Sequence, residues 1–354
     1  MKLFKSLLVA PATLGLLAPL SATANELNLN DVSGYSSSEE IQNISEFNPA
    51  EELAVTNSRV DGLEARFNNF EAGGFSETTT ASFGVDMLVG AVDGASSEVA
   101  TFDYQMGIGL ETSFTGEDSL SATIDIGNAS SVAGGADGLN FDSTGDKLML
   151  DGLTYTFPVG GATVMVGDNT DISGVYSGAC AYSAFTDYMG NCGTGNSVGV
   201  GGNGATAAMS YAFDSGFTLA GGISSTPTSI LTEEGADTFG IEAAYSGDSY
   251  SVAVAYADAE TTTYWGINGT YAFDFATLSA GVESADADGS DTATGFMVGL
   301  SFAEVGPGSL DVGMGTTGNF TDDDEEYYIY EASYAYPVND GVTITPGVLS
   351  LIHI

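Results

Sequence analysis

The side chains that most often carry out acid–base or nucleophilic chemistry are scarce in this sequence. His353 is the single histidine of 354 residues, and Cys180 and Cys192 are the only cysteines. A Ser-His-Asp or Cys-His arrangement needs an imidazole as its base, and zinc sites usually need histidine or several cysteines. A two-carboxylate glycosidase fits the inventory alone, but the strands described below do not suit a soluble enzyme core. We therefore expect no catalytic residue, no bound metal and no cofactor.

Carboxylates are the abundant chemical group. The chain has 48 Asp and Glu against five Lys and Arg, a formal net charge of −43. Nucleic acid is excluded as a partner because nothing offsets phosphate repulsion. Eight carboxylates occupy the polar positions of alternating segments and are candidate pore-lining residues: Asp86, Asp103, Glu111, Asp125, Asp151, Glu242, Glu283 and Glu331. In a channel such residues favour cations. The alternative is that they are ordinary hydrated side chains whose charges are screened by salt.

One basic residue is a pore-lining candidate. Lys147 is the single Lys or Arg after residue 66. In a constriction it would help small anions pass, whereas the simpler interpretation is a solvated strand end.

Three acidic stretches resemble parts of calcium-binding loops: 134–142 (GGADGLNFD), 286–291 (DADGSD) and 321–326 (TDDDEE). The latter two lack the bidentate Glu of an EF-hand at the required spacing, and the first motif occurs once. Solvated outer loops are the favoured interpretation; Ca²⁺ that bridges these loops to lipopolysaccharide is the alternative.

The first 24 residues have the pattern of a secretory signal. Lys2 and Lys5 precede an apolar stretch, and Ala22-Thr23-Ala24 forms an A-x-A cleavage site. In an exported chain, two cysteines twelve positions apart are expected to pair. A Cys180–Cys192 disulfide would stabilise the loop 169–203 by roughly 3 kcal/mol in the chain-entropy model.

The segment before residue 79 divides into two parts. Residues 25–50 are polar without a clear period and are expected to be irregular. Residues 51–72 are expected to form a coiled-coil helix that ends before Gly73-Gly74. Its seam residues are Leu53, Thr56, Val60, Leu63, Phe67 and Phe70. An ordinary amphipathic helix packed on a domain is the alternative.

From residue 79 onward, apolar and polar residues alternate, which predicts β-strands. Fifteen strands are expected, near 79–91, 99–114, 119–128, 147–157, 161–168, 204–214, 216–225, 237–246, 249–259, 262–274, 276–284, 292–302, 308–315, 326–336 and 341–348. Short and long connections roughly alternate, which is typical of an antiparallel meander with tight turns at one end and long loops at the other.

The apolar faces of these strands are expected to meet lipid. A soluble sandwich would carry mixed charges on its outer face, with Lys at its edges, whereas Lys is almost absent here. Aromatic residues near the tight turns suit a girdle at a membrane interface: Tyr155, Phe157, Tyr211, Phe213, Tyr271, Phe273, Phe302, Tyr334 and Tyr336. We therefore predict an all-β transmembrane barrel, residues 79–348, around a water-filled lumen.

The end of the chain departs from this pattern. Bacterial barrels close with an even number of strands, so fifteen strands suggest a sixteenth that is missing through truncation. The last residues, LSLIHI (349–354), match a translated sequencing adapter and are expected to be non-native. A genuine terminal strand is the alternative.

Four stretches resemble the outer-membrane porins of cyanobacteria. They are 27–47 (LNLNDVSGYSSSEEIQNISEF), 148–168 (LMLDGLTYTFPVGGATVMVGD), 177–225 (from SGACAYSAF to AGGISS) and 330–348 (YEASYAYPVNDGVTITPGV). The resemblance covers nearly the whole chain. It implies a periplasmic N-terminal region, a coiled-coil stalk and a trimeric barrel of the carbohydrate-selective porin superfamily, whose members are often labelled iron-uptake porins. It also favours a loop 169–203 that folds into the lumen rather than outward.

The chain departs from the family in two places. Members usually carry an S-layer-homology domain, but here ISEF (44–47) runs almost directly into the helix, so cell-wall anchoring does not carry over. The terminal aromatic assembly signal is also missing.

The sequence thus predicts an outer-membrane porin that passes inorganic ions and small hydrophilic solutes. Its expected surroundings are outer-membrane lipid and lipopolysaccharide. The alternatives are a channel selective for iron species or carbohydrate, a structural protein that ties the outer membrane to the wall, and a secreted acidic surface protein.

Overall fold

The computed structural model describes residues 78–91, 93–94, 100–129, 144–199, 204–232, 235–322 and 324–353. The predicted signal peptide, irregular segment and coiled-coil seam lie outside these residues, so these predictions are not tested. Within the described part of the chain, no helix is long and apolar enough to cross a membrane.

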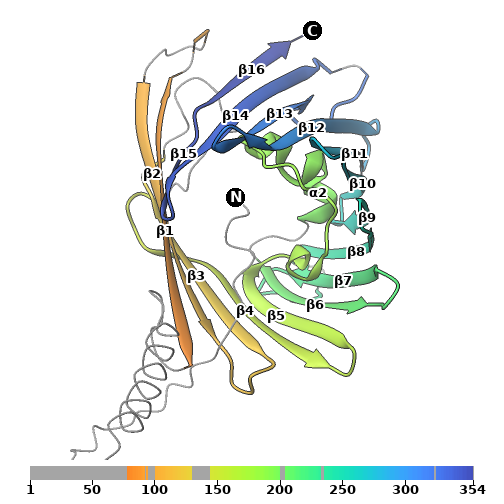
Figure 1. Cartoon of the computed structure of the whole chain (residues 1–354). Coiled ribbons are helices and arrows are strands. Elements are labelled where there is room, and N and C mark those ends of the chain that lie inside the picture. The colour runs from red at the N-terminus through yellow and green to blue at the C-terminus, as the bar shows by residue number, and fades with distance from the viewer. Residues whose placement is uncertain are drawn as a thin grey trace, which may run out of the picture. The chain divides into compact units, whose positions relative to one another are not determined.

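The described residues form one antiparallel sheet in which the first fifteen strands pair with their neighbours in sequence, whereas the sixteenth pairs with the fourteenth (Figure 1). Its strands are β1 (Thr79–Ala91), β2 (Ala100–Thr112), β3 (Ser119–Gly127), β4 (Met149–Val159), β5 (Ala162–Thr170), β6 (Gly204–Ala212), β7 (Phe217–Ser225), β8 (Asp237–Ser246), β9 (Tyr250–Asp258), β10 (Thr262–Ala272), β11 (Thr277–Ala287), β12 (Ala293–Val305), β13 (Gly308–Thr316), β14 (Tyr327–Asn339), β15 (Val342–Ile344) and β16 (Gly347–His353). This is the predicted all-β barrel wall, and each predicted strand has a counterpart.

The alternation in the sequence separates the two faces of the sheet. In β8, Phe239 and Ile241 are 49% and 61% exposed, whereas Glu242, the residue after Ile241, is 2% exposed. The same outward row of large apolar side chains continues on β1, where Phe83 is 70% exposed. The sheet therefore has an apolar outward face and a polar inward face, as the period of two dictates.

Tight turns join many of the strands at one end. Gly216, between β6 and β7, has φ +85°, and an added Cβ there would lie 2.6 Å from the carbonyl oxygen of Ser246. Only glycine fits both this left-handed backbone and this close approach.

The last two strands share one position in the sheet. β15 and β16 both pair with the same edge of β14, and the pairs Tyr336↔Ile344 and Tyr327↔His353 belong to one continuous register. Sixteen strands therefore occupy fifteen positions, the number predicted. Residues 349–353 lie in β16; whether they are foreign to the protein stays a prediction.

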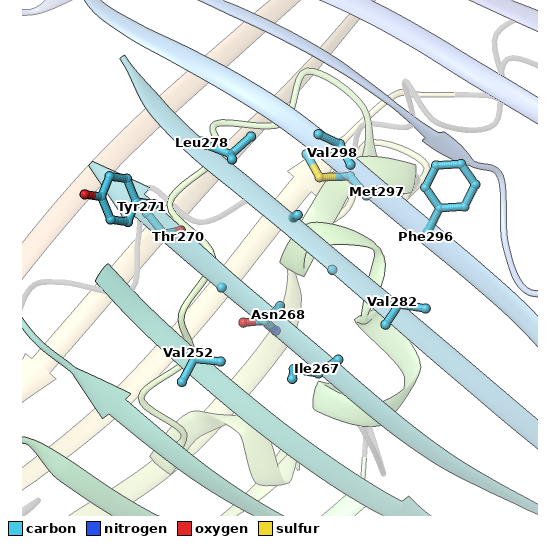
Figure 2. A pocket seen from close by; sticks show the side chains of 13 residues that line it. Val252, Ile267, Asn268, Thr270, Tyr271, Leu278, Val282, Phe296, Met297 and Val298 are labelled. Atoms are coloured by element: carbon cyan, nitrogen blue, oxygen red, sulfur yellow. The ribbon is translucent and has the colours of Figure 1, made fainter. Parts of the chain in front are cut away.

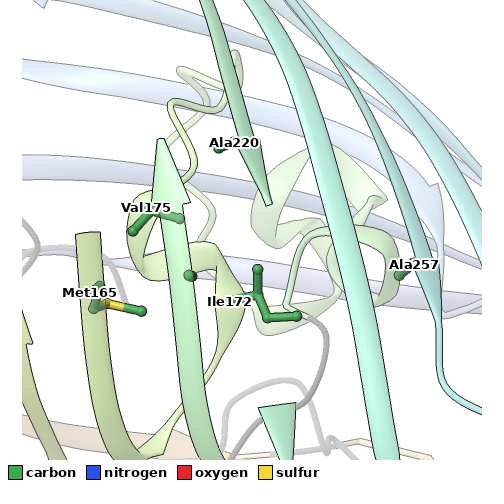
Figure 3. Packing of buried hydrophobic residues seen from close by; sticks show 6 residues of the cluster. Met165, Ile172, Val175, Ala220 and Ala257 are labelled. Carbon is green, nitrogen blue, oxygen red and sulfur yellow. The ribbon is translucent and has the colours of Figure 1, made fainter. Parts of the chain in front are cut away.

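The chain between β5 and β6 carries three short helices: η4 (Ile172–Val175), η5 (Asp187–Gly193) and α2 (Gly195–Val198). Figure 1 shows the strands curving around this segment. The buried apolar residues lie mainly between the segment and the wall rather than between two sheets. In the cluster of Figure 3, Ile172 and Val175 pack against Met165 of β5, Ala208 of β6 and Ala220 of β7.

Candidate functional site

The segment between β5 and β6, residues 171–199, is here called the inner loop because it packs on the inward face of the sheet. Its helix η4 contacts β5, β6 and β7, α2 contacts β8, β9 and β10, and η5 contacts β10 to β13. One loop thus covers the inward face of about half of the strands. The family resemblance favoured inward over outward folding of this loop, and the structure has the inward arrangement.

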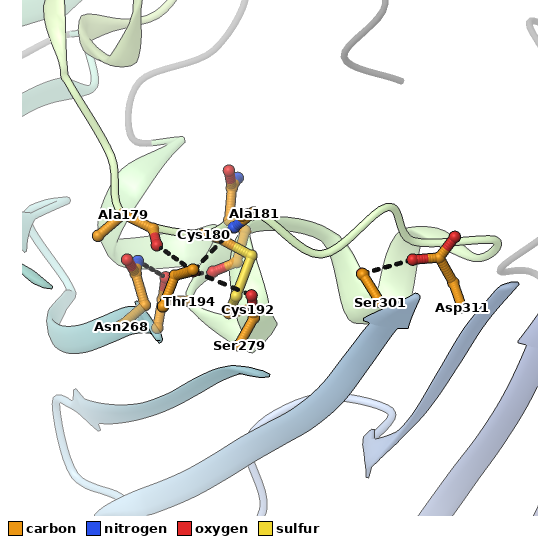
Figure 4. The surroundings of a disulfide bond; sticks show 11 residues. Ala179, Cys180, Ala181, Cys192, Thr194, Asn268, Ser279, Ser301 and Asp311 are labelled. Atoms are coloured by element: carbon orange, nitrogen blue, oxygen red, sulfur yellow. Dashed lines mark hydrogen bonds between the residues drawn. A yellow bond between two sulfur atoms is a disulfide. The ribbon is translucent and has the colours of Figure 1, made fainter. Parts of the chain in front are cut away.

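A disulfide closes the middle of the inner loop. Cys180 and Cys192 are bonded, with their Cα atoms 5.6 Å apart (Figure 4), which confirms the predicted pairing. Next to the bridge, Thr270 donates from Oγ1 to the carbonyl oxygen of Ala179 at 2.6 Å, and Asn268 donates to Thr194 Oγ1 at 2.8 Å. Both wall residues belong to β10, so the bridged part of the loop is bound to this strand.

Three glutamates of the wall hold the inner loop, and we call them the pinning carboxylates: Glu242 of β8, Glu283 of β11 and Glu331 of β14. Glu331 accepts hydrogen bonds from the backbone N–H groups of Phe185 and Thr186, both at 2.9 Å, and from Thr186 Oγ1 at 2.6 Å. Charge-assisted bonds of this kind are stronger than neutral ones.

The other two pinning carboxylates bind the two ends of the loop. Glu242 accepts from the backbone N–H groups of Ser177 at 2.7 Å and Gly178 at 3.2 Å. Glu283 accepts from Ser197 N at 2.6 Å and Asn196 Nδ2 at 2.7 Å. The loop is therefore fixed at its start, its centre and its end by side chains from three separate strands.

This arrangement corrects the prediction that Glu242, Glu283 and Glu331 line the pore. They do point to the inward face, but they are 2%, 1% and 4% exposed, respectively. The inner loop covers them, and their charges are directed at loop amides rather than at water. Alternation identifies the face of a strand but not what covers it.

Inward glycines provide the space in which the inner loop lies close to the wall. A Cβ at Gly281 of β11 would collide with the carbonyl oxygen of Cys192, and one at Gly313 of β13 would lie 2.6 Å from Tyr182 Oη. Gly299 of β12 likewise faces the ring of Tyr182. These glycines were not among the predicted site residues, because glycine in a strand otherwise signals only a bulge or a weak position.

The inward face of β1 to β3 carries four of the other five acidic candidates. Asp86 is exposed and accepts a hydrogen bond from Gln105 Nε2 at 3.1 Å. Glu111 and Asp125 are half-buried, and Asp103 is 4% exposed. These four lie at inward register positions, so the structure places them on one wall.

Two further candidates lie differently. Asp151 sits where the β3–β4 register shifts, so alternation does not determine its face there. Lys147 is exposed and precedes β4, in agreement with the simpler interpretation of a solvated strand end.

The predicted aromatic girdle is a set of ring contacts at the tight-turn end. Tyr155 stacks with Phe157 at 5.3 Å between centroids, and the Tyr211–Phe213 and Tyr271–Phe273 pairs lie at 4.8 and 4.6 Å. Two rings that the prediction missed join this set: Phe114 contacts Tyr155, and Phe275 contacts Phe273. Three further missed rings, those of Phe217, Tyr245 and Tyr250, contact one another. Phe302 of β12 and Tyr334 and Tyr336 of β14 also lie near this end.

A carboxylate supports the girdle in the turn between β2 and β3. Asp118 accepts hydrogen bonds from Ser113 Oγ at 2.7 Å, Thr115 N at 2.8 Å and Tyr155 Oη at 2.7 Å. Burial would raise the pKa of Asp118, but these hydrogen bonds together outweigh it and hold the pKa below its ordinary value.

The acidic stretch 134–142 lies outside the described residues, and the described parts of 286–291 and 321–326 contain no metal-binding group. No three His, Cys, Asp or Glu side chains come together there in a metal-binding group. Asp324 instead accepts from the backbone N–H of Thr321 at 3.1 Å and from its hydroxyl at 2.9 Å, which lowers the pKa of Asp324.

Comparison with known proteins identifies the class of fold. No family model matches the chain. An engineered variant of the porin of Rhodopseudomonas blastica is 17% identical, covers 77% of this chain and 94% of its own, and has a TM-score of 0.51. A loop-deletion variant of OmpT, an outer membrane protein of Vibrio cholerae, is 11% identical, covers 78% and 95%, and has a TM-score of 0.56. The chain therefore has the fold of the porin-type β-barrels.

One curated protein matches in sequence. An uncharacterized protein of Nostoc sp., alr4550, is 37% identical over 131 residues, which are 32% of this chain and 23% of that protein. The match thus spans less than a quarter of that relative's length.

Proposed function

We propose that this protein is an outer-membrane porin through which inorganic ions and small hydrophilic solutes diffuse passively. The observation that carries the proposal is the inner loop, which three pinning carboxylates bind to the inward face of a porin-type barrel. A loop held there occupies part of the lumen and leaves a narrower polar passage beside the wall of β1 to β3. No chemical step is required of any residue.

The passage is expected to prefer cations. Asp86, Glu111 and Asp125 occupy inward positions of β1 to β3, and acidic linings favour cations. Among the described residues Lys147 is the single Lys or Arg, and it precedes β4 rather than lying on the inward face. The pinning carboxylates contribute less, because loop amides surround them.

The experiment is a planar-bilayer recording across a KCl gradient. The proposal predicts a steady conductance whose reversal potential has the sign of cation selectivity. Replacement of Asp86 and Asp125 by Asn should move that potential toward zero, while Asp274→Asn, in the turn between β10 and β11, should leave it unchanged. Absence of conductance from correctly folded protein would contradict the proposal.

The finer assignment follows the resemblance in the sequence. Membership in the cyanobacterial, carbohydrate-selective porin superfamily is part of this proposal and rests on the four stretches of sequence that resemble those porins. A homotrimer in contact with lipopolysaccharide, with the N-terminal region in the periplasm, belongs to the same proposal. A sugar channel would need aromatic side chains along the lumen. Tyr264, an aromatic residue on the inward face of β10, packs against the apolar cluster of η4.

A further inference from the structure

An open groove of about 480 Å³ lies on the outward face of β9 to β12 (Figure 2). Its centre is formed by Gly269 and Ala280, which are direct partners in the β10–β11 ladder. The paired residues on either side along the strands are larger: Tyr271 and Leu278 in one direction, Ile267 and Val282 in the other. Two small side chains among large ones thus leave a hollow in the outward wall, here called the outer groove.

The outer groove is apolar and runs along the strands. Its outward walls come from aliphatic side chains such as Val252 and Val298, which are 37% and 42% exposed. One end is bounded by Tyr271, whose ring contacts Phe273 of the aromatic girdle. The other end reaches Val282 and Phe296, farther from the girdle. A linear apolar chain that enters from the girdle level fits this shape.

The charges near the girdle end of the groove determine which headgroup charge is compatible with such a chain. The turn between β8 and β9 carries Asp248, and the turn between β10 and β11 carries Asp274. A hydrogen bond of 2.8 Å from Ala272 N to Ser249 O joins the two turns. The described residues supply no Lys or Arg there, so an anionic headgroup would meet repulsion without a counter-charge.

We propose that the outer groove binds one acyl chain of a membrane lipid whose headgroup carries no net charge. This inference rests on the proposed membrane location of the barrel. A second copy of the chain suits the groove less well, because protein interfaces carry about one hydrogen bond per 100–200 Å². Among the outward side chains that line the groove, that of Tyr271 alone carries a polar group.

The test compares Ala280→Leu, which fills the groove, with Ala243→Leu, which enlarges an outward alanine of β8 away from it. Each protein is reconstituted with equal amounts of phosphatidylcholine and phosphatidylglycerol, extracted in detergent and examined by native mass spectrometry. The wild type and Ala243→Leu should retain one phosphatidylcholine per chain, and Ala280→Leu should lose it. Val298→Phe, which narrows the groove from β12, should show the same loss if Ala280→Leu fails to fold.

Three results would overturn the inference. They are equal retention in all variants, preferential retention of phosphatidylglycerol, and a change of oligomer mass in Ala280→Leu without a change in bound lipid, which would identify a second copy as the occupant.

The single tryptophan separates this inference from the proposed function. Trp265 lies outward on β10 and is 50% exposed. Brominated phosphatidylcholine should quench its fluorescence if the barrel lies in the bilayer. Absence of quenching would contradict the proposed membrane location. Quenching together with equal lipid retention in the wild type and in Ala280→Leu would contradict only the binding of lipid in the outer groove.

Discussion

At the scale of single residues, the notable feature is that charged groups serve as structural hydrogen-bond acceptors. Glu331 is 4% exposed and has no cationic partner among the described residues; its carboxylate accepts three hydrogen bonds from the inner loop. A buried charge is tolerable only where hydrogen bonds replace water. The loop and the glutamate therefore depend on each other.

Glu331→Ala should release the centre of the inner loop. It leaves the N–H groups of Phe185 and Thr186 without their acceptor, and buried groups left unsatisfied cost about 1–3 kcal/mol each. Hydrogen exchange of residues 181–191 should become faster. Glu304→Ala, at an exposed position of β12, is the control and should leave this exchange unchanged. Equal exchange in both variants would contradict the pinning role.

Asp118 offers a test by titration. Its hydrogen bonds favour the ionised form and lower its pKa, so their contribution to stability is complete above the ordinary aspartate pKa of 3.8 and is lost only as pH falls through the lower, folded value. NMR titration of the Asp118 carboxyl carbon should therefore give a midpoint below 3.8. A midpoint at or above this value would show that the turn does not hold the carboxylate as described.

At the scale of elements, the strands could be predicted from the alternation of residues, whereas the contacts that hold the inner loop on the wall could not. A strand such as β8, predicted at 237–246, has one periodic pattern that suffices to define it. The position of the inner loop depends on contacts between distant residues, such as Thr186 and Glu331, which are 145 positions apart. Periodicity carries no information about such contacts. The sequence could therefore place Glu331 on the inward face but not beneath the loop.

Gly281→Val should displace η5 from the wall. A side chain at this position collides with the carbonyl oxygen of Cys192, which is backbone and cannot rotate away. The loop must then move toward the lumen, so the single-channel conductance should fall. The matched control is Gly90→Val on β1, where an added Cβ meets only the side chain of Leu88, at 3.8 Å. Equal conductance in the two variants would contradict the close packing of the loop.

At the scale of the whole molecule, the barrel wall divides its inward face between two tasks. The strands from β5 to β14 bind the inner loop through glycines and pinning carboxylates, whereas β1 to β3 present Asp86, Glu111 and Asp125 at inward positions. The chemistry of the passage should therefore come mainly from one side. From alternation alone, all eight acidic candidates were predicted to line the pore, because alternation does not show which part of the wall the loop covers.

In the proposed function, the inner loop narrows a water-filled passage. The most direct test of this narrowing is the single-channel conductance of a variant in which residues 176–198 are replaced by a short Gly-Ser linker, compared with the wild type in the same KCl solution. Heat-modifiable mobility on gels checks that both proteins are folded barrels. Because the linker would leave the lumen wider, we expect a several-fold larger conductance for the variant. An equal or smaller conductance from a folded variant would contradict it.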